Sequence, residues 1–99
     1  MKIVAVTACP TGIAHTYMAA EQIETFAKRA GHEIRVETQG SMGIENELSA
    51  QAIADADVVI FAVDIEVEQK ERFEGKKIIQ ASVSEAIKKP EALLARAGG

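Results

Sequence analysis

Apolar residues along this chain follow two patterns, short continuous runs and stripes at helical spacing. Residues 3–8 and 58–63 are apolar runs of strand length, and such runs are typical of strands buried on both faces of a sheet. Residues 16–30 place small and apolar side chains at i, i+3, i+4 and i+7, which predicts one buried stripe on a helix. Gly31 follows as the expected stop signal.

The middle of the chain predicts a strand at the edge of a sheet and a short helix. Residues 33–38 alternate polar and apolar side chains, which is typical of a strand with one exposed face. The following residues 39–47, with the sequence QGSMGIENE, predict a loop. Ser49 then supplies an N-cap for a short helix that extends to Ala54.

The last third of the chain predicts a short strand between two helical segments. Residues 66–73 form a charged segment of weak helical character, and its charges predict a solvated face. Residues 78–81 form a short apolar strand. Ser82 and Glu85 have the spacing of a capping box, and they open a C-terminal helix that Pro90 breaks or kinks.

Four strands separated by helices predict an α/β fold of the Rossmann-like kind. We expect a three-layer sandwich in which a four-stranded parallel sheet, joined by right-handed crossovers, is flanked by helices. The two apolar strands belong in the centre, which gives the strand order 2-1-3-4. Ligands of such sheets bind beyond the carboxyl ends, where the order reverses, and this point lies between the first and third strands. Cys9 follows the first strand there, and Asp64 follows the third.

Composition narrows the possible functions. The 99 residues predict a single domain over residues 1–99. The net charge of −4 gives no positive field for nucleic acid, so we expect no nucleic-acid partner. No apolar run approaches the roughly 18 residues that span a bilayer. One cysteine cannot form an internal disulfide, which favours the cytoplasm, and no His/Cys cluster has metal-ligand spacing, so we expect neither a metal nor another cofactor.

The stretch TACPTGIAHTYMAAE, which begins at Thr7, places the only thiol at a turn from strand to helix. Proline and glycine supply the turn geometry, and the first N–H groups of the helix have no internal partner. These groups can form a cradle for a phosphate-sized dianion, and the helix dipole favours negative charge there. A thiolate beside such a cradle is a nucleophile towards phosphorus. The predicted phosphate site consists of the acceptor Cys9 and the loop residues Pro10, Thr11, Gly12, Ile13, Ala14, His15 and Thr16.

The resulting phosphocysteine has two possible fates. Transfer to water gives a phosphatase, and transfer to another acceptor gives a carrier. Low-molecular-weight tyrosine phosphatases use Cys, five residues, Arg, then Ser or Thr, but here His15 stands in place of the arginine and Thr16 follows. Arginine holds the transferring group through a bidentate fork that histidine lacks, so hydrolysis should be poor. A third reading, a non-catalytic phosphate-binding regulatory module, predicts full activity without the Cys9 thiol.

The same stretch resembles the phosphorylation loop of the fructose-specific enzyme IIB domains of the bacterial phosphoenolpyruvate-dependent sugar phosphotransferase system. The resemblance continues through VETQGSMGIENELSAQAIADADVVIFAVDIEVE and RFEGKKIIQ and covers nearly the whole chain. It implies a phosphotransferase whose Cys9 accepts a phosphoryl group from a phosphohistidine of the IIA domain. The group then passes to fructose, or a fructose-like sugar, held by the membrane IIC domain. The resemblance thus implies a cytoplasmic protein, not itself membrane-spanning, that meets the inner face of the membrane through IIC.

Two polar residues near the predicted site have alternative roles. His15 either caps or packs in the first helical turn, or it contacts the phosphate and orients the donor. Asp64 either caps the segment that follows it or positions the Cys9 loop. Direct contact of Asp64 with phosphate is disfavoured because like charges repel.

Overall fold

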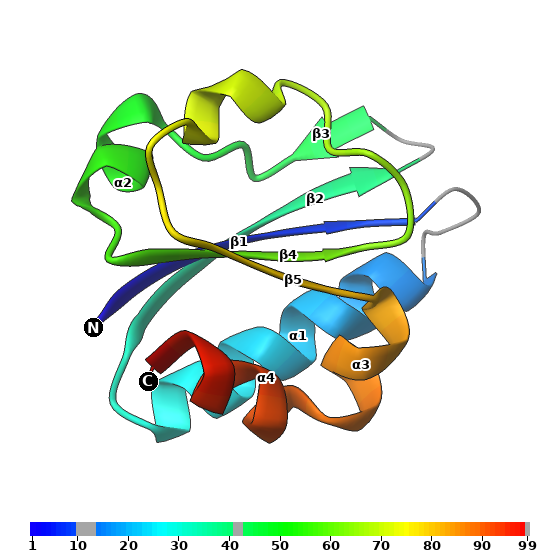
Figure 1. Cartoon of the computed structure of the whole chain (residues 1–99). Coiled ribbons are helices and arrows are strands. Elements are labelled where there is room, and N and C mark those ends of the chain that lie inside the picture. Colours follow the sequence, from blue (N-terminus) through cyan, green and yellow to red (C-terminus); the bar gives the residue numbers. More distant parts are fainter. Residues whose placement is uncertain (10–13, 41–42, 99) are drawn as a thin grey trace.

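The computed structural model describes residues 1–9, 14–40 and 43–98. Within these residues the chain forms a five-stranded sheet in the order β3-β2-β1-β4-β5 (Figure 1). The strands β2, β1, β4 and β5 are parallel to one another, and β3 is antiparallel to β2. Their bounds are Lys2–Ala8 for β1, Glu33–Gly40 for β2, Gly43–Glu45 for β3, Val58–Val63 for β4 and Ile78–Ala81 for β5.

The α/β class and the relative order of the four predicted strands are confirmed, but the prediction of a purely parallel four-stranded sheet is wrong. Residues 39–47 were expected to be a loop. Instead β2 continues to Gly40 and pairs with the short strand β3, with Thr38 opposite Glu45 and Gln39 opposite Ile44. A strand of three residues is too short to show the alternation by which strands are found in a sequence. The sheet is therefore mixed, and β3 forms its edge.

Helices cover both faces of the sheet, as the three-layer prediction requires. The helices α1 (Ala14–Arg29), α3 (Val83–Lys88) and α4 (Pro90–Gly98) lie on one face. The helix α2 (Ala50–Asp55) and the 3₁₀ helix η1 (Lys70–Phe73) lie on the other (Figure 1). None of the helices in the described part of the chain combines the length and the apolar character that crossing a bilayer requires.

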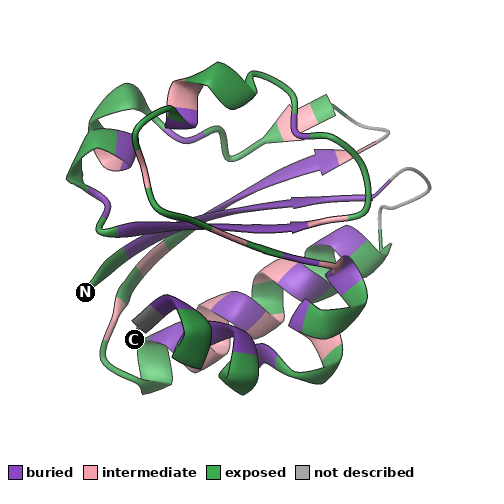
Figure 2. Ribbon diagram, in the orientation of Figure 1, coloured by how far each residue is buried: buried purple, intermediate pink, exposed green. Residues whose placement is uncertain are grey.

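The two central strands supply side chains to a hydrophobic core on each face, and they are buried along nearly their whole length (Figure 2). In β1, Ile3 and Ala5 face α1, whereas Val4 and Val6 face α2 and η1. The strand β4 alternates in the same way. Four residues of the predicted α1 stripe are buried, namely Thr16, Ala19, Ile23 and Ala27. Ala20 and Phe26 are partly buried and pack against the core, whereas Ala30 lies beyond the helix and is exposed.

Local signals place the helix ends where the sequence predicts them. Gly31 follows α1 with a φ of +84°, a left-handed conformation that glycine adopts without strain. Ser49 accepts an N–H bond from Ala52 at 3.0 Å and caps α2. Ser82 and Glu85 form the predicted capping box of α3. Pro90 occupies the first position of α4, where its missing N–H leaves no helical bond unmade, so it separates the two helices.

One expectation about exposure is wrong, and a second is only partly right. The strand β2 is half-exposed only in its first residues, and Val36, Glu37, Thr38 and Gln39 are all buried. Residues 66–74 are not only a solvated face, because the side chains of Val67 and Phe73 in this region are buried. The ring of Phe73 meets Phe61 of β4 edge-on, with centroids 5.2 Å apart. Only the last four residues of the predicted helical segment are helical, as η1.

Candidate functional site

Cys9 lies at the carboxyl end of β1 and is only 6% exposed, in contact with the core under α1. The strands β2 and β4 flank β1, so Cys9 stands at the predicted reversal of strand order. The helix α1 begins at Ala14, five residues further along the chain. The loop residues Pro10, Thr11, Gly12 and Ile13 lie outside the described residues, and the predicted cradle of N–H groups therefore stays a prediction.

A buried hydrogen bond joins the end of β1 to the first turn of α1. The hydroxyl of Thr7 donates to the carbonyl oxygen of Thr16 at 3.1 Å, and both residues are almost completely buried. Sequence reasoning gave Thr7 no role, although it is the one polar residue in an otherwise apolar run. The bond holds the first turn of α1 against the end of β1, the strand that Cys9 directly follows.

The first turn of α1 presents exposed side chains beside this edge of the sheet. His15 is exposed and does not pack into the core. Tyr17 and Met18 are 40% and 48% exposed. The hydroxyl of Tyr17 donates a hydrogen bond to the carboxylate of Glu45 in β3. This hydrogen bond, a small desolvation and the negative charge of Glu45 all raise the pKa of Tyr17.

Asp64 lies at the same edge, directly after β4, and connects three elements. Its backbone N–H donates to the carbonyl oxygen of Ala8 at 2.9 Å, next to Cys9. Its side chain Oδ1 accepts the backbone N–H of Val83 at 3.2 Å, in the first turn of α3. The carboxylate therefore caps α3 rather than the segment that immediately follows it. Ile65, the next residue, is 39% exposed.

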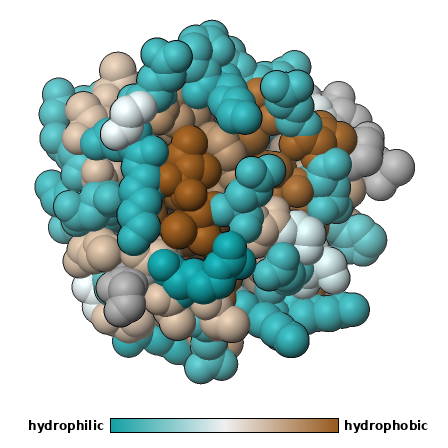
Figure 3. All heavy atoms as spheres, in the orientation of Figure 1, coloured by the Kyte–Doolittle hydropathy of each residue, from teal (hydrophilic) through white to brown (hydrophobic). Residues whose placement is uncertain are grey.

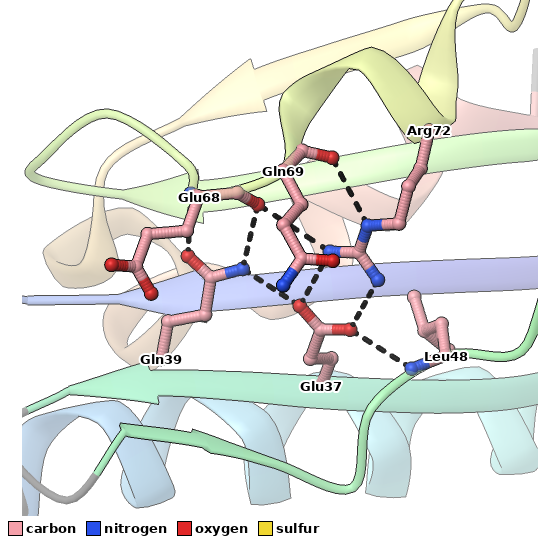
Figure 4. A network of polar contacts seen from close by, with 6 residues as sticks. All are labelled: Glu37, Gln39, Leu48, Glu68, Gln69 and Arg72. Carbon is pink, nitrogen blue, oxygen red and sulfur yellow. Dashed lines mark hydrogen bonds and ion pairs between the residues drawn. The ribbon is translucent and has the colours of Figure 1, made fainter.

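Sequence reasoning missed a network of polar side chains at the carboxyl end of β2 (Figure 4). Glu37 is fully buried, and both its carboxylate oxygens accept N–H bonds from the guanidinium of Arg72 at 2.9 Å. The backbone N–H of Leu48 donates to Glu37 at 2.9 Å, and the side chain of Gln39 donates at 2.7 Å. Burial by itself raises the pKa of Glu37, but these hydrogen bonds and the charge of Arg72 outweigh it, so the pKa is lowered.

Gln39 also binds the backbone of Glu68 through both ends of its amide. Its Nε2 donates to the Glu68 carbonyl oxygen at 3.2 Å, and its Oε1 accepts the Glu68 N–H at 2.9 Å. The sequence placed Gln39 at the start of the predicted loop 39–47, so neither its place in β2 nor its burial was expected. In Figure 4 the side chains of Gln39 and Arg72 both point towards the carboxylate of Glu37, which lies between them.

Hydrophobic side chains are sparse on the face seen in Figure 3, where they show near its centre and again towards the side to which the parallel strands point. Exposed large apolar side chains in the described residues include Tyr17, Met18 and Ile65, and all three belong to segments next to the carboxyl edge. The site thus combines a nearly buried thiol, the start of a helix of 16 residues and a rim with exposed apolar groups.

Comparison with known proteins identifies the family. Residues 4–96 match the family described as "PTS system, Lactose/Cellobiose specific IIB subunit". The chain belongs to the IIB family of the phosphotransferase systems. The "PTS system fructose-like EIIB component 2" of Escherichia coli K12 is 54% identical over 95 residues, which are 96% of this chain and 90% of that protein. The "PTS system fructose-specific EIIABC component" of Bacillus subtilis is 53% identical over 96 residues, which are 97% of this chain and 15% of that protein.

Solved structures of similar proteins agree with this assignment. A domain of the fructose-specific IIABC component of Borrelia burgdorferi has a TM-score of 0.91 and 53% identity, and it covers 95% of this chain and 89% of the other. A predicted fructose-specific IIB of Escherichia coli has a TM-score of 0.92 and 40% identity, and it covers 97% and 85% of the two chains. The resemblance that the Cys9 stretch indicated is confirmed. This IIB chain is therefore a phosphotransferase component with a phosphoryl-carrier role in sugar uptake.

Proposed function

We propose that this IIB chain carries its phosphoryl group on Cys9, as phosphocysteine. The observation that supports this most directly is the position of Cys9, at the carboxyl end of a central strand and five residues before the first turn of α1. The loop that would surround the phosphate consists of Pro10, Thr11, Gly12, Ile13, Ala14, His15 and Thr16. We assign Asp64, whose N–H donates to the carbonyl of Ala8, a supporting role for the loop without direct contact with the phosphate.

The proposed reaction has two transfers. In the first, the Cys9 sulfur attacks the phosphorus of a phosphohistidine on the IIA domain. An S–P bond forms, the N–P bond breaks, and the imidazole nitrogen keeps the electron pair and takes a proton. In the second, a sugar hydroxyl held by the IIC domain attacks the same phosphorus. A P–O bond forms and the S–P bond breaks; the Cys9 sulfur keeps the electron pair of that bond, and the hydroxyl proton is released to solvent.

The partners follow from the family and from the names of the relatives. The name of the Bacillus subtilis relative joins A, B and C components, and this chain spans a small part of that protein. We propose that residues 1–99 form one IIB domain, which meets IIA and IIC on the cytoplasmic side of the membrane. The relatives are named for fructose or a fructose-like sugar, whereas the family model is described by lactose and cellobiose. We assign fructose or a fructose-like sugar because the individual relatives that are more than 50% identical to this chain carry that name, whereas the other sugars appear only in the description of the whole family.

The surroundings of Cys9 favour a carrier over a phosphatase. His15 occupies the position of the phosphatase arginine, and its exposed imidazole cannot provide a bidentate contact. Tyr17, Met18 and Ile65 add exposed apolar surface next to the site. Such a rim suits a protein partner that brings or takes a phosphoryl group better than it suits a small phosphate ester.

The decisive experiment is intact-protein mass spectrometry after incubation with phosphoenolpyruvate, the general phosphotransfer proteins and a fructose-type IIA domain. We expect one phosphoryl group on the wild type, none on Cys9→Ser, and one on the control His32→Gln, whose side chain lies in the turn after α1. A phosphoryl group that persists in Cys9→Ser contradicts the assignment. Rapid turnover of an aryl phosphate by the wild type supports the hydrolase, and full sugar phosphorylation by Cys9→Ser supports the regulatory module.

A further inference from the structure

Glu37, Gln39 and Arg72, here called the Glu37 cluster, are joined by hydrogen bonds to the two carboxylate oxygens of Glu37. The side chain of Glu37 is fully buried, and that of Arg72 is only 18% exposed. Burying an ion pair has a desolvation cost that often exceeds its attraction, and well-packed apolar residues can be as stable. The pair does, however, hold its two side chains in a defined relative position. The two parallel N–H bonds of Arg72 fix both the distance and the orientation of the groups that they join.

The Glu37 cluster fixes one end of the segment 64–69. Gln39 binds the backbone N–H and carbonyl of Glu68, and the Nε of Arg72 donates to the carbonyl oxygen of Gln69 at 3.0 Å. Arg72 also approaches the Glu68 carbonyl at 3.4 Å. Gln39 of β2 therefore binds the backbone of residue 68 directly. Arg72 binds the backbone of residues 68 and 69 and is itself held to β2 by its ion pair with Glu37.

The other end of the segment 64–69 is attached next to the thiol. The N–H of Asp64 donates to the carbonyl of Ala8, the residue before Cys9. In the sheet, Ala8 is the register partner of Gln39. The segment thus begins at the end of β4, bonds to the end of β1 and is held at β2. The segment 64–69 is therefore a short backbone connection between the Glu37 cluster and the residue that precedes Cys9.

We propose that Glu37, Gln39 and Arg72 are positioning residues for phosphoryl transfer at Cys9, because they hold the segment 64–69 in place at the carboxyl edge. This inference rests on the proposed function. The segment carries the acidic side chains of Asp64, Glu66 and Glu68. If it moves, negative charge moves relative to a dianionic phosphoryl group, and the backbone that orients the sulfur moves with it. Misplacement of reacting atoms by about 1 Å can lower a rate about 100-fold.

The test compares three substitutions in the Glu37 cluster with a matched control. Arg72→Lys keeps the positive charge and removes the fork, Glu37→Gln keeps the shape and removes the charge, and Gln39→Met releases residue 68 while leaving the ion pair in place. The control is Arg35→Lys, an exposed arginine of the same strand. Single-turnover phosphorylation by phosphorylated IIA is measured over a range of IIA concentrations, together with alkylation of Cys9 by iodoacetamide.

In the variants of the Glu37 cluster we expect the rate at saturating IIA to fall at least about ten-fold, with the half-saturating IIA concentration changed less than two-fold. Arg35→Lys should match the wild type. The alkylation rate of Cys9 should change in the variants of the cluster and not in the control. Rates are taken per folded molecule, with the folded fraction from urea unfolding, so that a merely structural role predicts no change. If Arg72→Lys or Glu37→Gln does not fold, Gln39→Met decides the question.

Several results would overturn the inference. Unchanged saturating rates in folded variants exclude a positioning role. A raised half-saturating concentration with an unchanged saturating rate makes the Glu37 cluster part of the IIA contact instead. Absence of a phosphoryl group on wild-type Cys9 contradicts the proposed function. In that case unchanged alkylation in the three variants also excludes any influence of the Glu37 cluster on Cys9.

Discussion

At the scale of single residues, charged pairs in this chain differ sharply in what they contribute. The pairs Lys28–Glu24 and Arg96–Glu85 join side chains that are about half exposed, and such pairs contribute little to stability. Glu37 is different because its carboxylate is closed off from water. Removing Arg72 leaves a buried charge without its principal partner, a loss that typically costs about 3–5 kcal/mol. Breaking this buried pair should therefore cost more than breaking either of the two exposed pairs.

The buried carboxylate predicts a specific dependence of stability on acid. The pKa of Glu37 in the folded chain is lowered from its ordinary 4.5, so just below pH 4.5 the unfolded chain binds more protons than the folded one. The stabilisation by Glu37 is complete above that value and is lost as pH falls through the folded pKa. We expect Glu37→Gln to flatten the decline in unfolding free energy between pH 5 and pH 3, measured by urea unfolding. Glu24→Gln, a control whose side chain is about half exposed, should keep the wild-type slope, and parallel curves for Glu37→Gln and wild type would contradict the argument.

The same residues show where the sequence stops being informative. Cys9 and Asp64 were assigned to the carboxyl edge from strand order alone, since each directly follows a central strand. Glu37 was read as solvent-facing because it alternates with apolar residues. Its partner Arg72 lies 35 positions away in a segment of charges, and no local pattern connects the two. A residue buried by a partner distant in the sequence cannot be recognised from its neighbours.

At the scale of elements, the signals that worked are those carried by a few adjacent residues. The caps at Ser49 and Ser82, the left-handed Gly31 and the break at Pro90 depend on local backbone chemistry, and all were found. The strand β3 was missed because it exists only through its pairing with β2. The 3₁₀ helix η1 is shorter than the predicted helical segment. The conformation of this segment depends on the burial of Val67 and Phe73 in the core, which no local pattern shows.

The cap of α3 gives a prediction at this scale. The hydroxyl of Ser82 accepts the N–H of Glu85 at 3.1 Å, so Ser82→Ala leaves that donor without its partner. Such a change costs about 0.5–2 kcal/mol. We expect the lower half of that range, because Asp64 still accepts the neighbouring N–H of Val83. The measurement is urea unfolding with circular dichroism. Ser84→Ala, an exposed serine inside the same helix, should be neutral or slightly stabilising, and equal losses for the two variants would rule out a capping effect.

At the scale of the whole molecule, the sheet joins two cores into one folding unit. Each central strand sends alternate side chains to the α1 face and to the α2 face. The prediction of the two central strands succeeded because this double burial leaves continuous apolar runs in the sequence. Because both cores share β1 and β4, we expect lost packing on one face to destabilise the strands against which the other face packs.

This coupling predicts that equal damage on opposite faces has equal consequences for the central strands. Ile23 of α1 and Ile53 of α2 are buried on opposite faces, at 0% and 4% exposure. Truncation of either to alanine should cost about 2–5 kcal/mol. If the domain unfolds as one unit, native-state hydrogen exchange of the β1 and β4 amides should accelerate in both variants by the amount that the global unfolding free energy falls. Suppose instead that Ile53→Ala speeds exchange in α2 alone and leaves β1 and β4 protected. The α2 face would then open independently of the rest, and the segment 64–69, which lies on that side, would be free to move while the core around Cys9 stayed closed.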